Sequence, residues 1–116
     1  MDKLTILEIK AERVTVPSAL ANIRRELELL SDIANRATDS EGKLPGLKRA
    51  LKAVNEKLWD IENQIREKEA EKRFDREFVE LARSVYHNND QRGRLKREIN
   101  LLLKSELIEE KQYASY

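Results

Sequence analysis

The chain has 116 residues, with 23 basic and 22 acidic side chains, three glycines, two prolines and no cysteine. This length suits one domain with its own core, and a chain without cysteine has neither disulfides nor thiolate metal sites. Charged residues make up 39% of the chain, but the net charge is only +1, whereas a dedicated DNA-binding protein usually has a basic excess. The abundance of leucine, glutamate, lysine, arginine and alanine favours helices. We therefore expect a single all-helical domain over residues 1–116, and nucleic acid is not an expected partner.

The first helix is predicted over residues 2–13. Asp2 either caps it or places a negative charge at its positive end. Its apolar residues form two stripes, one with Leu4 and Leu7 and one with Ile6 and Ile9. A short helix that is apolar on two sides packs between its own neighbours or against a second chain. The β-branched residues before Pro17 end it.

The second helix is predicted from about residue 18 to residue 37, with Ser18 as its N-cap. Its apolar stripe repeats at helical spacing, and turn-forming residues 38–42 follow it. The stripe consists of Leu20, Ile23, Leu27, Leu30, Ala34 and Ala37.

Two long helices follow, over residues 44–70 and 76–110, and each carries a coiled-coil-like seam at alternating steps of three and four. The first seam is Leu44, Leu47, Leu51, Val54, Leu58, Ile61 and Ile65, and the second is Leu81, Val85, Asn88, Arg92, Leu95, Ile99 and Leu102. When the helices are paired antiparallel, the residue numbers of facing positions keep a nearly constant sum, which centres the turn near residue 71. The charged segment 67–75 lies there, and Asp75 is the expected N-cap of the last helix. The sequence thus predicts a long helical hairpin.

Gly93 is the main argument against one continuous last helix, because a mid-helix glycine costs about 1 kcal/mol relative to alanine. The seam nevertheless keeps its phase through residues 88–93, and we expect the helix to continue. This helix is longer than its hairpin partner, so its apolar end, with Leu107 and Ile108, needs cover from the first helices or from another subunit. A homodimer is therefore expected in preference to a monomer.

The densest polar group interrupts the second seam, and two interpretations of it stay open. It could be an anion or polar-ligand site lined by Arg92 and Lys96, or a buried polar layer that fixes the helix register. An open, cation-lined cavity would favour the first, and a closed layer with satisfied hydrogen bonds the second. The candidate residues are Asn55, Asn88, Asn89, Asp90, Arg92, Lys96 and Asn100.

Trp59, the single tryptophan, is a further candidate binding residue. Tryptophan is enriched in interface hot spots, so it could anchor a partner, or it could close the core or a dimer interface.

Other residue patterns that could bind a metal ion give weaker evidence of a site. His87 and Asp90 would supply only two metal ligands. The acidic pairs Glu77/Glu80 and Glu106/Glu109 have spacing that can hold Mg²⁺, but each lacks a second acidic pair nearby. No catalytic residue, metal site or cofactor is assigned.

Three segments resemble a family of functionally uncharacterised bacterial and phage helical domains. They are DKLTILEIK at residues 2–10, LKAVNEKLWDIE at residues 51–62, and residues 78–100 with the later ending EEK at 109–111. The resemblance covers nearly the whole chain and implies an all-helical domain without supplying an activity. Members sometimes occur with tetratricopeptide repeats or in polysaccharide-related contexts, which is an association only.

We predict an all-α bundle built on the hairpin, with the two shorter N-terminal helices packed across it. The favoured function is a non-catalytic interaction or scaffolding module that forms a homodimer and binds a protein partner. The alternative is a small helical enzyme or anionic-ligand binder, either nucleotide-handling or similar to the helical chorismate mutases, whose pockets use arginine and lysine. The charged N-terminal segment and the short apolar runs predict a cytoplasmic protein without a membrane partner.

Overall fold

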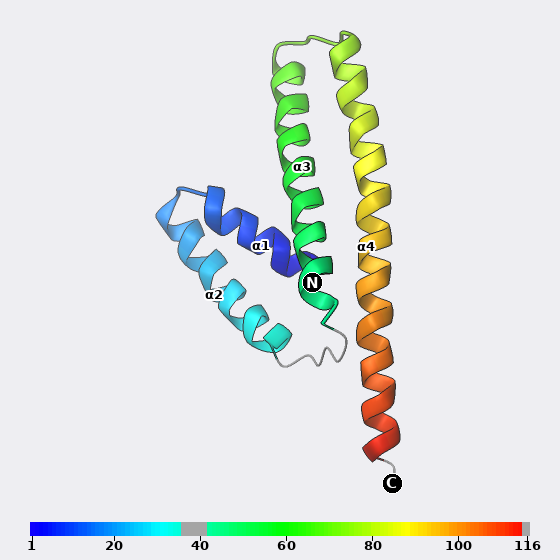
Figure 1. Cartoon of the computed structure of the whole chain (residues 1–116). Coiled ribbons are helices and arrows are strands. Elements are labelled where there is room, and N and C mark those ends of the chain that lie inside the picture. The colour runs from blue at the N-terminus through cyan, green and yellow to red at the C-terminus, as the bar shows by residue number, and fades with distance from the viewer. Residues whose placement is uncertain (36–41, 115–116) are drawn as a thin grey trace.

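A computed structural model describes the backbone of residues 1–35 and 42–114 and the side chains of residues 1–35 and 42–103. The described chain forms the helices α1 (Asp2–Arg13), α2 (Pro17–Asn35), α3 (Leu44–Ala70) and α4 (Arg76–Ala114) and contains no strand. The predicted all-α class is therefore confirmed. Figure 1 shows α3 and α4 as a long hairpin, with α1 beside α3 and α2 on the far side of α1.

The helix boundaries differ from the predictions at two places. α2 begins at Pro17, because proline fits a first helical position where its missing N–H costs nothing, so Ser18 lies inside the helix instead of capping it. α4 continues to Ala114 instead of ending at Glu110, and the intervening residues include no glycine or proline to stop it. It is unbroken through Gly93, as the seam predicted. The predicted end of α2 at Ala37 lies outside the described residues.

The turn between α3 and α4 is held by side chains as well as by the backbone. The Phe78 amide donates to the Asp75 carboxylate at 3.0 Å, which confirms Asp75 as the cap of α4. Lys68 donates to Asp75 and to Glu77, each at 3.0 Å. The cation at the end of α3 therefore joins two acids at the start of α4, where negative charge also suits the helix dipole.

Lys72 is the residue that reverses the chain, and its φ of 53° is left-handed. The Arg73 amide bonds to the Lys68 carbonyl at 2.9 Å and the Lys72 amide to the Glu69 carbonyl at 3.1 Å. This pattern is a Schellman cap, in which glycine normally occupies the left-handed position. A lysine there carries a steric cost, because its Cβ crowds the following carbonyl oxygen.

Lys72→Gly is therefore expected to raise the free energy of unfolding by up to about 1 kcal/mol. Thermal and urea unfolding at one fixed protein concentration measure it. Lys72→Ala is the matched control, because it removes the same side chain and keeps the Cβ. Equal stabilisation by both variants would assign the effect to the lost charge and contradict the steric account.

The core lies at the end of the hairpin where α3 begins. Leu51 and Ile99 are at most 1% exposed and form one cluster with Leu44. In the antiparallel pairing that centres the turn near residue 71, Leu44 faces Ile99, and the two side chains belong to this cluster. Val54 and Leu58 are also buried. Half-buried side chains complete the packing, namely Met1, Leu47, Leu95, Leu102 and Leu103.

α1 lies between two neighbours, because it packs against both α2 and α3. Thr5, Leu7 and Ile9 are buried in this arrangement, which accounts for the two apolar stripes without a second chain. α2 has no buried residue, and Leu29 and Ile33 are more than 60% exposed. α1 thus packs on the hairpin, and α2 packs on α1.

Within the described ranges, no helix combines the length and the apolar character that crossing a bilayer demands.

Candidate functional site

Arg92 of α4 forms the centre of the polar layer, and its partner is the first residue of α1. Its Nε donates to Asp2 Oδ1 at 3.0 Å, and its terminal nitrogen donates to Asp2 Oδ2. Both side chains are partly shielded, with 30% of Arg92 and 19% of Asp2 exposed. A bidentate contact of this kind fixes the orientation of the two side chains as well as the distance between them. It ties the beginning of the chain to the middle of α4.

Asn55 of α3 and Thr5 of α1 complete the cluster. The Asn55 amide nitrogen donates to Asp2 Oδ1 at 3.1 Å and to the Thr5 hydroxyl at 2.9 Å. The Thr5 hydroxyl donates in turn to the Asp2 carbonyl at 2.8 Å. Thr5 is fully buried and Asn55 is 6% exposed. We call Asp2, Thr5, Asn55 and Arg92 the α1 anchor, because they join α1 to both hairpin helices.

The electrostatics of the α1 anchor favour a charged Asp2. Burial alone would raise the pKa of this carboxyl, but hydrogen bonds from Arg92 and Asn55 and the charges of Arg92 and Lys96 outweigh it. The pKa of Asp2 is therefore lowered from its usual value. The bond to Asp2 likewise raises the pKa of Arg92. The cluster is an ion pair in which each charge stabilises the other.

The other predicted site residues divide between this cluster and solvent. Lys96 Nζ lies 3.7 Å from Asp2 Oδ2. The Asn88 amide nitrogen donates to the Ser84 carbonyl of its own helix at 2.8 Å, so Asn88 bonds within α4. Asn89, Asp90 and Asn100 are exposed. The structure thus brings Asn55, Arg92 and Lys96 together around Asp2.

A small cavity of about 240 Å³ adjoins the α1 anchor. Its lining includes Arg92, Asn89 and Trp59, together with Asn55, Ile6, Ile9, Leu58 and Glu62. Trp59 is half-buried, and the guanidinium carbon of Arg13 lies 5.9 Å from the centre of its ring, which is within cation–π range. The tryptophan thus supports the junction of α1 and α3 and still reaches the cavity.

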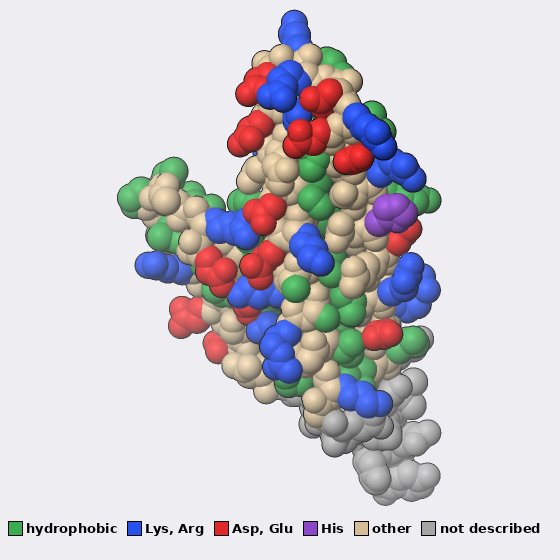
Figure 2. Space-filling view, turned by 45° about the horizontal axis from the view of Figure 1, so that its top comes forward, with side chains coloured by type: hydrophobic (Ala, Val, Ile, Leu, Met, Phe, Trp, Pro, Cys, Tyr) green, Lys and Arg blue, Asp and Glu red, His purple; other side chains and the backbone are tan. Residues whose placement is uncertain are grey.

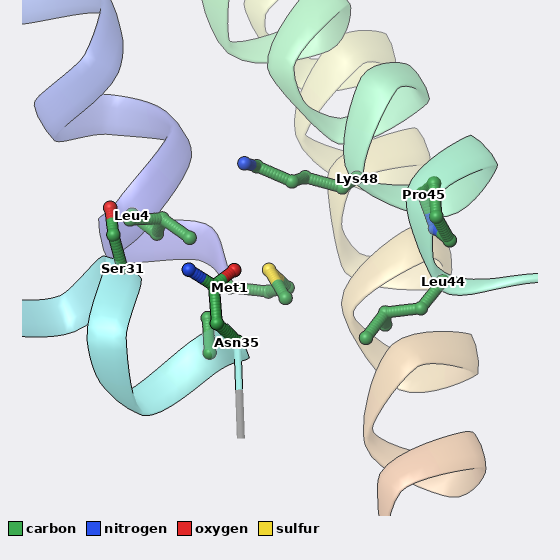
Figure 3. A pocket seen from close by; sticks show the side chains of 8 residues that line it. Met1, Leu4, Ser31, Asn35, Leu44, Pro45 and Lys48 are labelled. Carbon is green, nitrogen blue, oxygen red and sulfur yellow. The ribbon is translucent and has the colours of Figure 1, made fainter. Parts of the chain in front are cut away.

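A second cavity of about 360 Å³ lies between α1, α2 and α3. Figure 3 shows Met1, Leu4 and Leu44 beside it, with Ser31 and Asn35 on the α2 side. Among the described residues that line it, Lys48 is the one charged side chain, and its Nζ lies 2.7 Å from Glu8. The cavity is thus a gap beneath α2 with a mixed polar and apolar lining.

The remaining acidic and histidine patterns do not gather into a site in the described part of the chain. Glu77 bonds to Lys68 and Glu80 lies 3.5 Å from Arg76, while the side chains of Glu106 and Glu109 lie outside the described residues. His87 is exposed and stacks edge-on with Tyr86. Across residues 1–35 and 42–103, no three metal-binding side chains lie together.

Asp2 and Thr5 are the members of the cluster that the sequence did not reveal. The sequence assigned Asp2 only a capping or dipole role. One signal was available, because Asp2, Thr5 and Ile9 share a helix face at spacings of three and four. A buried threonine one turn from an aspartate is a usable sign of a polar contact to another helix.

A search of curated proteins and a search of solved structures found no match. One protein-family model matches residues 1–116, and it is described as a family of unknown function, DUF6165. The α1 anchor and the hairpin core both lie within this range, and the chain belongs to that family.

Proposed function

We propose that the protein is a non-catalytic helical interaction module that acts as a homodimer in the cytoplasm. The observation that carries the proposal is the excess of exposed surface. The chain exposes 8596 Å², whereas a compact monomer of this mass exposes about 6,600 Å². The excess of roughly 2,000 Å² lies in the range that one subunit buries in an obligate homodimer.

The shape of the molecule supports the same proposal. The radius of gyration is 17.8 Å and the extents are 64 × 33 × 19 Å, whereas a compact domain of this length has a radius of about 13 Å. Only eight apolar side chains are buried within the described part of the chain. Large apolar side chains lie exposed on several helices, among them Leu29, Ile33, Val79, Tyr86 and Leu101. A thin molecule with a small core gains stability by covering such residues with a partner.

The alternative, a small enzyme or anion binder, has less support from the geometry. Arg92 is already neutralised by Asp2, and the adjoining cavity is smaller than the roughly 300 Å³ of a usual ligand site. Arg13 of α1 bonds to Asp60 on the surface, so its charge is also already paired. A saturable thermal shift with phosphate or a dicarboxylate, absent in Arg92→Ala, would reverse this preference.

Sedimentation velocity over a wide concentration range tests the dimer directly. We expect a mass of twice the 13.6 kDa monomer at high concentration, with a reversible fall toward the monomer on dilution. A monomer mass throughout the range would overturn the proposal.

A further inference from the structure

A groove of about 700 Å³ lies between the start of α3 and the passing α4. Gly46 and Leu47 line it from α3, and Leu101 and Leu102 line it from α4. Leu101 is 60% exposed, although its neighbours pack on the core. Figure 2 shows hydrophobic side chains along the line where α3 and α4 meet. The hairpin therefore leaves an apolar surface on its own seam.

The α3 side of this groove allows close approach by another helix. A Cβ built on Gly46 would meet only the Arg49 guanidinium, at 3.9 Å. Ala50 and Ala53 follow on the same helix and are also exposed. Helix axes approach to about 8 Å where the contact residues are small. A leucine from a second molecule could thus lie close to the α3 backbone.

The end of α4 gives a second reason to place a partner here. Ile99 packs with Leu44, the first residue of α3. The α4 backbone continues to Ala114, which is about four turns farther. Figure 1 shows this part of α4 extending past the beginning of α3. A molecule docked in the groove would lie beside the extension and could pack along it.

The charges around the groove fit a second copy of the same chain. Arg49 of α3 and Glu98 of α4 line it together with Lys43, and neither Arg49 nor Glu98 forms an ion pair with another described side chain. In a two-fold symmetric interface, residue i of one copy meets residue j of the other, and j meets i. One unpaired cation and one unpaired anion on the same surface are therefore self-complementary.

We infer that two copies dock groove to groove, related by a two-fold axis, with Arg49 of each copy paired with Glu98 of the other. Leu101 of each copy lies in the apolar centre of this interface, beside Gly46 of the other. The inference rests on the proposed homodimer and identifies its surface. The surface excess of the monomer lies in the range that one subunit of an obligate homodimer buries.

Charge reversal tests the pairing between the copies. Arg49→Glu alone and Glu98→Arg alone each place like charges opposite one another twice in a homodimer. Each variant is expected to weaken dimerisation about tenfold or more. An equimolar mixture of the two variants should recover dimers, because every reversed side chain then meets one of opposite charge. Sedimentation velocity of each variant and of the mixture, at matched concentration and low salt, provides the measurement.

Leu101→Glu is expected to abolish the dimer, and Leu29→Glu on α2 is the matched control that should leave it intact. Both leucines are exposed, so circular dichroism should show unchanged helix content. A wild-type dimer that survives the charge reversals and Leu101→Glu would overturn this surface and leave the homodimer standing. A dimer lost only in Leu29→Glu would move the interface to α2. A wild-type monomer would overturn both proposals.

Discussion

Leu51→Ala is expected to lower the free energy of unfolding by about 3 kcal/mol, with a fall in melting temperature of roughly 10 °C or more. Leu51 is fully buried between Leu44 and Ile99. Truncation removes apolar contacts on both hairpin helices and leaves a cavity that rigid neighbours fill incompletely. With so few buried apolar residues, the fold has little stability to spare. Urea and thermal unfolding at one protein concentration measure the change.

Leu29→Ala is the matched control, because it makes the same chemical change at a side chain that is 61% exposed. Its effect should stay within about 0.5 kcal/mol. Comparable losses in the two variants would mean that the hairpin end is not the principal core.

Arg92→Ala is expected to lower the free energy of unfolding by about 2 kcal/mol. The substitution leaves the shielded Asp2 carboxylate with only the Asn55 amide as a hydrogen-bond donor. Solvent reaches both partners, so the loss is smaller than for a fully buried pair. The effect should be concentrated at α1. Amide hydrogen exchange of α1 and α2 should therefore accelerate more than that of the α3–α4 hairpin. Arg94→Ala, on an exposed part of the same helix, is the control.

The dependence of the free energy of unfolding on pH, at acid pH, provides an independent check of the Asp2–Arg92 ion pair. The pKa of Asp2 is lower in the folded protein than in the unfolded chain. The stability that follows is complete above about pH 4 and is lost as the pH falls through the folded pKa. Asp2→Asn should remove this contribution of Asp2, so that the free energy of unfolding changes less with pH between pH 5 and the acid transition. An unchanged slope in Asp2→Asn would show that other carboxyls cause the acid sensitivity.

The hairpin could be predicted from the sequence because it depends on local periodicity. The residue numbers of facing seam positions keep a nearly constant sum, which predicts a turn near residue 71. The chain reverses at Lys72. Asp75 was recognisable as a cap because capping involves residues three apart. The end of α4 was placed four residues early, since an exposed helix end without glycine or proline has no sharp stop signal.

The candidate site was only partly predictable, because it depends on contacts between distant segments. The polar interruption marked Arg92 and drew attention to Asn55. Periodicity places a residue on one face of one helix and does not show which distant segment meets that face. Asp2 lies 90 positions from Arg92. The polar cluster is therefore a junction between the hairpin and α1 and not a layer within the hairpin.

The length of that connection bears on the order in which the chain assembles. α3 and α4 are joined by a short turn, so their pairing closes a small loop, whereas joining Asp2 to Arg92 spans 90 positions and costs more entropy. We expect the hairpin to form first and to provide the surface on which the first turn of α1 docks. During synthesis the N-terminal segment leaves the ribosome first, yet it cannot reach its final contacts until Arg92 has emerged. The segment that is made first is thus among the last to be fixed.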